Sequence, residues 1–401
     1  MRDGWRDTTL SEILTRRSDR LGAAPEPRIL TVTEGAGLVD QLAHWGRRVA
    51  TEDVSAYKVV DPGDVVYNVY LLWNGAIGQN LFRERGVTSP VYEVFTPNKS
   101  LNPRYIGLLL QQKSMREAFD SISIGTIPRR RRAPWQDFLR LRVALPPRQD
   151  QDRIVDLVEA LDGAISTSDR ATQTARSLAR RVRDHLFSEA TVGSEGVSAG
   201  QYFDMLLGRQ KSARQSVGDH VIPYLRAANV SSDGFLLADV QTMNFSPAEQ
   251  ARYCDVMLVE GGSLGQSSMW NGQIPGAIGF DKHVIRLRGV PGRSLAEYAL
   301  QWTRWSHETG ALDAQATGVT IRALGFGRAC AMPVPALSLP EQAALVDPLQ
   351  SADSVVERHR SVSARLHVLR SNLLTALLSG DHEIPESYDE LIGGRFDVGD
   401  G

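Results

Sequence analysis

The chain has 401 residues, enough for two or three average domains, and its hydrophobic share of 42% is ordinary for a protein with buried cores. It has no apolar run of the roughly 18 residues that a membrane helix needs and no apolar signal region at its start, so we expect a cytoplasmic protein. The two cysteines, Cys254 and Cys330, lie too far apart in sequence to suggest a disulfide framework or a zinc site, and the net charge of −2 permits nucleic-acid binding without indicating it.

Residues 1–145 are predicted to form a globular domain of short strands and polar turns. A strand, a Pro-Gly turn and a second strand are expected between Tyr57 and Asn68, and Trp73-Asn74-Gly75 is a further turn signal. Asn102-Pro103 is expected to open a helix that continues to Phe119.

The most basic stretch of the chain follows this helix, with four consecutive arginines beside prolines and a tryptophan. Guanidinium groups suit phosphates and guanine edges, so the stretch is a candidate DNA contact; a solvated surface loop is the alternative. The candidate contacts of this domain are Arg129, Arg130, Arg131 and Arg132, with Asn68, Trp73 and Asn74 as weaker choices.

Two long segments, residues 146–190 and 339–380, look like copies of each other. A shift of 191 positions, which places Gln151 on Gln342, aligns them without a gap. Both are predicted to be long helices with a heptad seam, because apolar residues step by four and three, and such a seam matches a partner helix lying alongside. The seam consists of Ile154, Val158, Leu161, Ile165, Val182 and Leu186 in the first copy and Leu345, Leu349, Val356, Leu366, Leu373 and Leu377 in the second.

The ends of the second segment are marked. Ser338-Leu339-Pro340-Glu341 has the capping-box spacing, and Gly380 follows the last apolar residue as a stop signal. Pro348 should kink this helix or delay its start. The middle of each seam is polar, and two core helices of a larger domain are the alternative. Under the same alignment Asp162 meets Asp353.

Residues 191–338 repeat the plan of the first domain loosely. Asp64 meets Asp255, a strand is expected at 223–230, another that alternates with one polar face is expected at 282–288, and the glycine-rich stretch 261–265 is interpreted as a strand turn. The candidate DNA contacts here are Arg209, Gln210, Lys211, Arg226, Asn229, Lys282, His283 and Arg322. Residues 381–401, with one arginine and seven acids, are expected to be a flexible acidic tail.

Catalytic motifs are missing from the sequence. A PD…(D/E)xK nuclease needs an acid two places before a lysine, and none of the five lysines has one. The stretch Asn102-Pro103-Arg104-Tyr105 only approaches the Asn/Asp-Pro-Pro-aromatic loop of an amino-methyltransferase, and no glycine-rich loop for S-adenosylmethionine accompanies it. The eight histidines form no metal cluster. We therefore predict a non-catalytic protein.

Two variable domains, each followed by a long helix, resemble the specificity subunits of type I restriction-modification systems over about residues 1–380. The residues that carry the resemblance are Leu145-Pro146-Pro147, Gln151-Asp152-Arg153-Ile154-Val155, Leu339-Pro340-Glu341-Gln342, Pro62 to Asn68, Ser89-Pro90-Val91-Tyr92 and Tyr224 to Val230. The family's usual Gly-Asp-Val-Leu is replaced by Cys254-Asp255-Val256-Met257, which puts local contacts in doubt.

The resemblance implies an α+β fold with two target-recognition domains, 1–145 and 191–338, and spacer helices that pair as an antiparallel coiled coil. Each domain would read half of a split site on double-stranded DNA. Two modification subunits would hold S-adenosylmethionine and methylate adenine, and restriction subunits with ATP and Mg would cleave. Apolar residues off the seam, Val155, Leu157, Val355, Val362 and Leu369, suggest that partner helices cover the spacer.

Two rival functions remain at this point. A stand-alone modifying enzyme would need a catalytic motif that the sequence lacks. A coiled-coil scaffold without DNA specificity would also duplicate its helices, but it would not explain two globular domains with matched turns.

Overall fold

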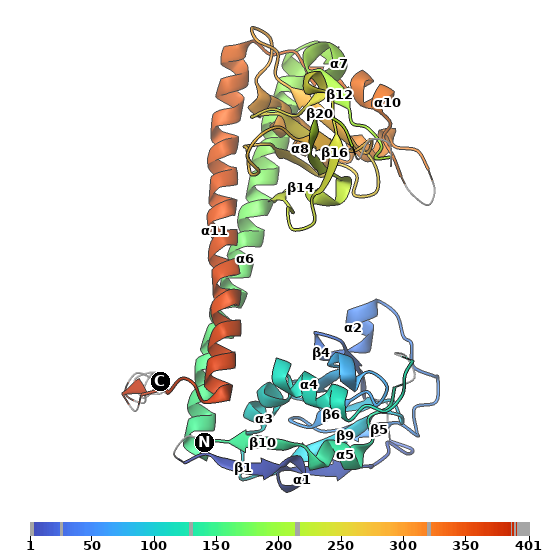
Figure 1. Cartoon of the computed structure of the whole chain (residues 1–401), viewed down its shortest axis with the longest axis vertical. Coiled ribbons are helices and arrows are strands. Elements are labelled where there is room, and N and C mark those ends of the chain that lie inside the picture. Colours follow the sequence, from blue (N-terminus) through green and yellow to red (C-terminus); the bar gives the residue numbers. More distant parts are fainter. Residues whose placement is uncertain are drawn as a thin grey trace. The chain divides into compact units, whose positions relative to one another are not determined.

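The structure, a computed structural model of the chain, describes residues 4–24, 27–127, 131–212, 217–318, 322–385, 387–388 and 390. It forms two compact units, Met1–Ser166 with Ala364–Gly401, and Thr167–Ser363. Each unit holds one globular domain, called domain 1 and domain 2 here, together with part of each of two long helices (Figure 1). The predicted α+β class, with a long helix after each globular domain, is confirmed.

Domain 1 contains two four-stranded sheets, with strand orders β2-β9-β6-β7 and β4-β3-β8-β5, and a separate β1–β10 pair. Its elements in chain order are β1 (Arg6–Thr9), α1 (Leu10–Ile13), β2 (Leu14–Arg17), β3 (Arg28–Thr33), β4 (Gly37–Asp40), α2 (Gln41–Trp45), β5 (Lys58–Val60), β6 (Val65–Tyr67), η1 (Leu72–Asn74), β7 (Ile77–Gln79), β8 (Gly86–Thr88), β9 (Glu93–Pro97), α3 (Pro103–Leu110), α4 (Lys113–Ser121), α5 (Trp135–Arg140) and β10 (Arg142–Leu145). The long helix α6 (Arg148–Gly193) follows at once.

Domain 2 repeats this plan. Its first sheet has the order β12-β20-β17-β18, its second the order β16-β13-β19, and β11 pairs with β21. Its elements are β11 (Gly196–Ser198), α7 (Ala199–Tyr202), β12 (Asp204–Leu207), β13 (Val221–Leu225), η4 (Ala227–Asn229), β14 (Val230–Ser231), β15 (Gly234–Phe235), β16 (Gln241–Asn244), η5 (Pro247–Glu249), β17 (Val256–Val259), β18 (Ser267–Met269), β19 (Gly279–Phe280), β20 (Val284–Arg288), α8 (Ala296–Glu308), α9 (Ala311–Gln315), α10 (Phe326–Ala331) and β21 (Pro333–Pro335). The second long helix, α11 (Leu339–Ser379), follows.

The shift of 191 positions found in the helices also relates the two domains. It carries α5 onto α10 residue for residue, and it carries β9 onto β20. The backbone hydrogen bond from Ala133 N to Val69 O (2.9 Å) recurs between Leu324 N and Glu260 O (2.8 Å). The sequence repeat is therefore a repeat of the fold.

Each domain packs on both long helices, at equivalent positions. The core of domain 1 includes Ile154, Val155 and Val158 from the start of α6, and Leu377 and Leu378 from the end of α11. The same shift maps these residues onto a set in the core of domain 2 or packed against it: Leu345, Val346, Leu349, Leu186 and Phe187. The apolar residues near the ends of each long helix therefore pack against a globular domain as well as facing the other helix.

The long helices run antiparallel where they pair. In the second unit, Ser363 of α11 donates to Asp169 of α6, and Asp353 accepts from Arg183 at 2.7 Å, so positions that rise along one helix fall along the other. All twelve predicted seam residues are buried or partly buried. Each helix begins beside a glutamine that holds a domain helix: Gln151 Oε1 accepts from Asn102 N at 3.0 Å, and Gln342 Oε1 from Leu295 N at 2.8 Å.

The predicted ends of the second helix are confirmed. Glu341 Oε2 accepts from Ser338 N at 2.7 Å, as a capping box requires, and Gly380 has a left-handed φ of +78°. Pro348 lies inside α11, which already begins at Leu339, so it does not delay the start of the helix.

Two local predictions need correction. The helix expected from Asn102 to Phe119 is two helices, because Gln112 adopts an extended backbone between α3 and α4. The two strands expected around the Pro-Gly turn are confirmed as β5 and β6, and they pair with other strands, β5 with β8 and β6 with β7 and β9. On the expected polar face of 282–288, Arg286 is buried and paired with Asp204 at 2.6 Å, while Lys282 and Arg288 remain partly exposed.

The turn before β6 and the equivalent turn before β17 are each closed by a buried aspartate. Asp64 and Asp255 are buried, and each accepts a backbone hydrogen bond that closes the turn, from Asp61 N (2.8 Å) and from Arg252 N (2.7 Å). Burial raises the pKa of the Asp64 carboxyl above its ordinary value. The residue before each aspartate has a positive φ, +87° at Gly63 and +67° at Cys254. Only the second has a side chain there, so the second turn carries backbone strain.

We expect Cys254→Gly to raise the free energy of unfolding by about 0.5–1 kcal/mol. The substitution removes a left-handed strain of roughly 1–2 kcal/mol, and the added freedom of the unfolded chain offsets about 0.4–1 kcal/mol of that gain. Thermal or urea unfolding measures the change. Cys254→Ala is the matched control, because it removes the thiol and keeps the strain; an equal gain from Cys254→Ala would contradict the explanation.

Candidate nucleic-acid interface

Of the four arginines predicted as DNA contacts in domain 1, the structure describes two: Arg131 is held by other residues, and Arg132 is not. Arg131 Nη1 pairs with Asp120 Oδ1 at 2.5 Å, and its guanidinium lies 5.2 Å from the ring centroid of Trp73. Arg132 is exposed, and its side chain has no hydrogen bond or ion pair with the described part of the chain. Arg129 and Arg130 lie outside the described residues. Arg132 is thus the better placed of the two for a phosphate or base edge, while Arg131 holds its own loop.

The two asparagine candidates of this domain are occupied by turns. Asn68 Oδ1 accepts from Tyr70 N at 3.0 Å, and Asn74 Nδ2 donates to Glu34. The carbonyl oxygen of Asn74 also accepts from Arg116 Nη2 at 2.8 Å. Both side chains are partly exposed, so a base contact would have to replace these bonds or use their remaining donors and acceptors.

In domain 2 candidates distant in sequence come together. Lys282 Nζ donates to Gln210 Oε1 at 3.2 Å, and Lys211 Nζ donates to Gln241 Oε1 at 3.1 Å. The neighbouring Arg209 forms an ion pair with Glu249. Residues 209–211 are exposed, so this cluster offers amine, amide and guanidinium groups to a ligand.

Asn229 is a correction, because it cannot reach DNA in this structure. Its side chain is fully buried, with Nδ2 donating to Leu236 O (2.8 Å) and Asp239 Oδ1 (2.9 Å) and Oδ1 accepting from Arg226 N (2.9 Å). Arg226 forms an ion pair with Asp239, and its hydrogen bond holds the pKa of the Asp239 carboxyl below its ordinary value. These residues shape the turn after β13.

His283 and the backbone of Arg322 both lie near Gly261. A side chain added at Gly261 would have its Cβ 3.7 Å from His283 Nδ1 and 3.8 Å from Arg322 O. His283 Nδ1 lies 3.2 Å from Glu260 Oε1, and Arg322 donates to the carbonyl oxygen of Asp313. Both side chains remain about half exposed, at 45% and 52%.

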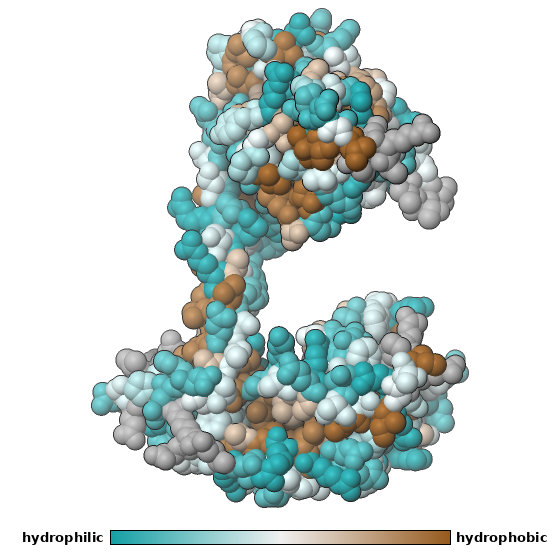
Figure 2. Space-filling model, in the orientation of Figure 1, coloured by the Kyte–Doolittle hydropathy of each residue, from teal (hydrophilic) through white to brown (hydrophobic). Residues whose placement is uncertain are grey.

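The long helices have a second surface besides the seam. Of the off-seam apolar residues named above, Val155 and Leu157 are at least partly buried against domain 1. Val355, Val362 and Leu369 of α11 are exposed at 41%, 47% and 51%. They recur every seven residues, which places them on one face of the helix. Figure 2 shows hydrophobic side chains at the surface of the paired helices.

Sequence reasoning missed the charged residues that attach the domains to the helices. In the first unit Asp162 of α6 pairs with Arg370 of α11, and Arg104 of α3 lies 3.8 Å from Asp162. The bond to Asp162 raises the pKa of Arg370, and burial lowers that of Arg104. Asp353 is the repeat partner of Asp162 and is bound in the same manner. The match between the two aspartates was the signal that could have identified them.

Within the part of the chain that the structure describes, no group of three or more histidine, cysteine or acidic residues could hold a metal ion. No described helix is long and apolar enough to cross a membrane. The architecture is therefore that of two related mixed domains, each with exposed basic and amide side chains, carried on paired antiparallel helices.

Comparison with known proteins finds a curated relative and solved structures that resemble this chain. No family model matches the chain. A curated relative, the specificity subunit of the type I restriction enzyme HindI from Haemophilus influenzae, is 24% identical over 213 residues, covering 49% of this chain and 45% of the relative. The chain thus spans less than half the length of the curated relative it matches.

Solved structures match over nearly the whole chain. One, from a study of complex assembly and conformational transition of the type I R-M system, has a TM-score of 0.57 at 18% identity and covers 95% of this chain and 99% of its own. The crystal structure of the type I S subunit from M. genitalium has a TM-score of 0.52 at 12% identity and covers 95% and 97%. The resemblance stated from the sequence is confirmed: the chain has the fold of type I specificity subunits.

Proposed function

We propose that this chain is the DNA-specificity subunit of a type I restriction-modification complex. One observation carries the proposal: two domains of one plan are docked at equivalent positions on a pair of antiparallel helices, in the fold that known specificity subunits have. Each domain reads one half of a split site on double-stranded DNA. The coiled-coil scaffold has no finding in its favour.

A split site supplies specificity that a single domain lacks. One mismatched base pair costs about 1–3 kcal/mol, so a domain that reads three or four pairs does not single out one site in a genome. Two linked domains multiply their discrimination when the half-sites have the separation that the protein spans. Arg132, Lys211, Lys282 and Arg322 are the strongest contact candidates, because their side chains remain at least partly accessible in the described structure.

The chain itself performs no chemical step in this proposal. Two modification subunits hold S-adenosylmethionine and methylate adenine, and restriction subunits use ATP and Mg to cleave. This division of labour is supported by the absence of a catalytic motif from the sequence. The exposed face of α11 at Val355, Val362 and Leu369 is the proposed contact for helices of the modification subunits.

Methylation mapping tests the function. The chain is expressed with its modification subunit, and the host DNA is sequenced for modified adenines. We expect one split motif with a fixed gap, and exchange of residues 1–145 for another recognition domain should change one half of the motif only. A continuous motif would refute the two-domain reading, and a lack of new methylation would favour the scaffold.

A further inference from the structure

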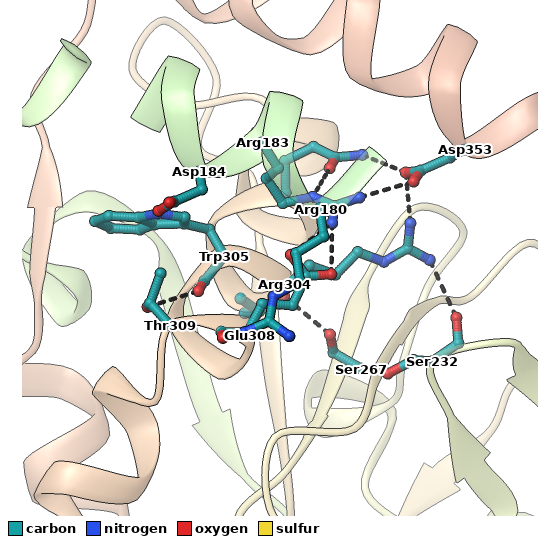
Figure 3. Close-up of polar contacts among 12 residues, drawn as sticks. Arg180, Arg183, Asp184, Ser232, Ser267, Arg304, Trp305, Glu308, Thr309 and Asp353 are labelled. Carbon is teal, nitrogen blue, oxygen red and sulfur yellow. Dashed lines mark hydrogen bonds and ion pairs between the residues drawn. The ribbon is translucent and has the colours of Figure 1, made fainter. Parts of the chain in front are cut away.

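A buried cluster of charges joins domain 2 to both long helices within the second unit (Figure 3). Its centre is Arg183 of α6, whose side chain is only 3% exposed. Arg183 Nε donates to Gln301 Oε1 (2.8 Å), and Nη1 donates to both carboxylate oxygens of Glu308 (2.6 and 2.7 Å). Arg183 Nη2 donates to Asp353 Oδ1 at 2.7 Å. One guanidinium therefore bonds α8 of the domain and α11 of the helix pair at once.

Asp353 completes the cluster with its second oxygen. Oδ2 accepts from Gln301 Nε2 at 2.8 Å and from Arg304 Nη1 at 2.5 Å. Arg304 Nη2 in turn donates to the carbonyl oxygen of Ser232 at 3.2 Å, in the loop after β14. These hydrogen bonds thus connect the long helices, through α8, to the loop that follows β14 in domain 2.

At this place directional bonds join the domain to the helices beside the apolar contacts of Leu186 and Leu349. A cavity of about 960 Å³, lined by Arg183, Arg304 and Asp353 among others, lies beside the cluster. On α11 the seam beyond Asp353 includes two polar residues, His359 and Ser363, and Ser363 donates a hydrogen bond to Asp169. Polar groups buried in a helix pair specify its register and orientation more strictly than apolar groups do.

The first unit contains the same kind of cluster. Asp162 pairs with Arg370 of the other long helix, and Arg104 of α3 approaches Asp162 at 3.8 Å and Glu159 at 3.7 Å. Two arginines meet two acids in both units, with one arginine from the domain and one from a long helix. Asp162 and Asp353 are repeat partners, so the arrangement occurs once in each half of the repeat.

We propose that Asp353, held by Arg183 and Arg304, is a positioning residue that sets the angle of domain 2 on the helix pair, and so restricts which half-site spacings the complex methylates. The inference rests on the proposed function. One additional base pair displaces a half-site by about 3.4 Å and turns it by roughly 35° along the duplex. A domain fixed by the cluster does not follow that turn, whereas a domain released from it does.

The test uses the full chain with its modification subunit and plasmids that carry the split motif with the natural gap, or with one base pair fewer or more. Asp353→Asn and Arg304→Gln are compared with the wild type. Arg304→Gln removes the bonds of Arg304 to Asp353 and Ser232, and it retains Arg183–Asp353 and the bonds through Gln301 and Glu308. It therefore tests orientation even if Asp353→Asn does not fold. We expect the preference for the natural gap to fall at least tenfold in both variants, with the half-site sequences unchanged.

Glu357→Gln is the matched control, because Glu357 lies on the same helix and pairs only with Arg360, at 2.7 Å, among the described contacts; it should keep the wild-type preference. The proposal is overturned if Arg304→Gln keeps the preference within twofold of the wild type. It is also overturned if Asp353→Asn unfolds thermally as the wild type does but reduces methylation equally at every gap, since that result excludes an effect on the spacing. A wild type without any split motif refutes the proposed function itself, which separates the two failures.

Discussion

Val362→Asp should abolish assembly with the modification subunit while the chain stays folded. Val362 is 47% exposed, in the middle of the exposed row that Val355 and Leu369 complete on α11. A carboxylate placed in an apolar helix contact loses its water without gaining a partner, so we expect at least a 100-fold loss of affinity, about 2.8 kcal/mol. The free energy of unfolding should change by less than about 0.5 kcal/mol, because the position is exposed in the isolated chain.

The measurement is sedimentation or calorimetric titration with purified modification subunit, next to a thermal unfolding curve of the chain alone. Val192→Asp is the control: Val192 is 91% exposed on α6, outside the α11 row. Wild-type affinity in the control and loss in Val362→Asp would locate the contact. Wild-type affinity in both variants would exclude this face as the partner surface.

The repeat and the helices could be predicted because their signal is local. Apolar residues at heptad spacing report a helix and its partnered face without knowledge of any distant residue. The positions Ile154 and Leu345, aligned by the sequence repeat, indeed occupy equivalent places in two separate cores. Glycine, proline and capping residues likewise marked the turns and helix ends, since their backbone preferences act within a few residues.

Strand pairing and side-chain availability could not be predicted, because they depend on residues far away in the chain. The sequence suggested that the Asn229 amide reads a base, but this amide is buried and bonded to Asp239 in the turn after β13. Arg131 and Arg132 were indistinguishable in sequence, and the positions of Asp120 and Trp73 decide that Arg131 is held. A residue type indicates what a side chain can bind, and the fold decides whether it is free.

The charged clusters could be predicted from the sequence only in part. The alignment of Asp162 with Asp353 was visible, but the arginines could not be paired by the same shift. The repeat position of Arg370 is Ala179, so Asp353 takes Arg183, one helical turn further along α6. The acid of the cluster follows the repeat and its cation does not, so the structure was needed to recognise the two clusters as related.

Leu349→Ala should lower the stability of the second unit by about 2–5 kcal/mol, the range for removing a buried leucine side chain. Leu349 is fully buried in the core of domain 2 with Leu345 and Phe187. Hydrogen exchange measured by mass spectrometry should show lost protection in β17 and α8, with domain 1 unchanged. Leu369→Ala is the control, since Leu369 is 51% exposed on the same helix.

The distribution of the lost protection between the two domains shows whether they unfold independently. The two cores consist of different residues, so a defect at Leu349 should remain in its own unit unless the long helices transmit it. Equal loss of protection in domain 1 would show that the units fold as one cooperative body. Confinement to domain 2 would show that each globular domain is stabilised by its own ends of α6 and α11. Under the proposed function, that independence is the physical condition for exchanging one half of the recognised site without disturbing the other.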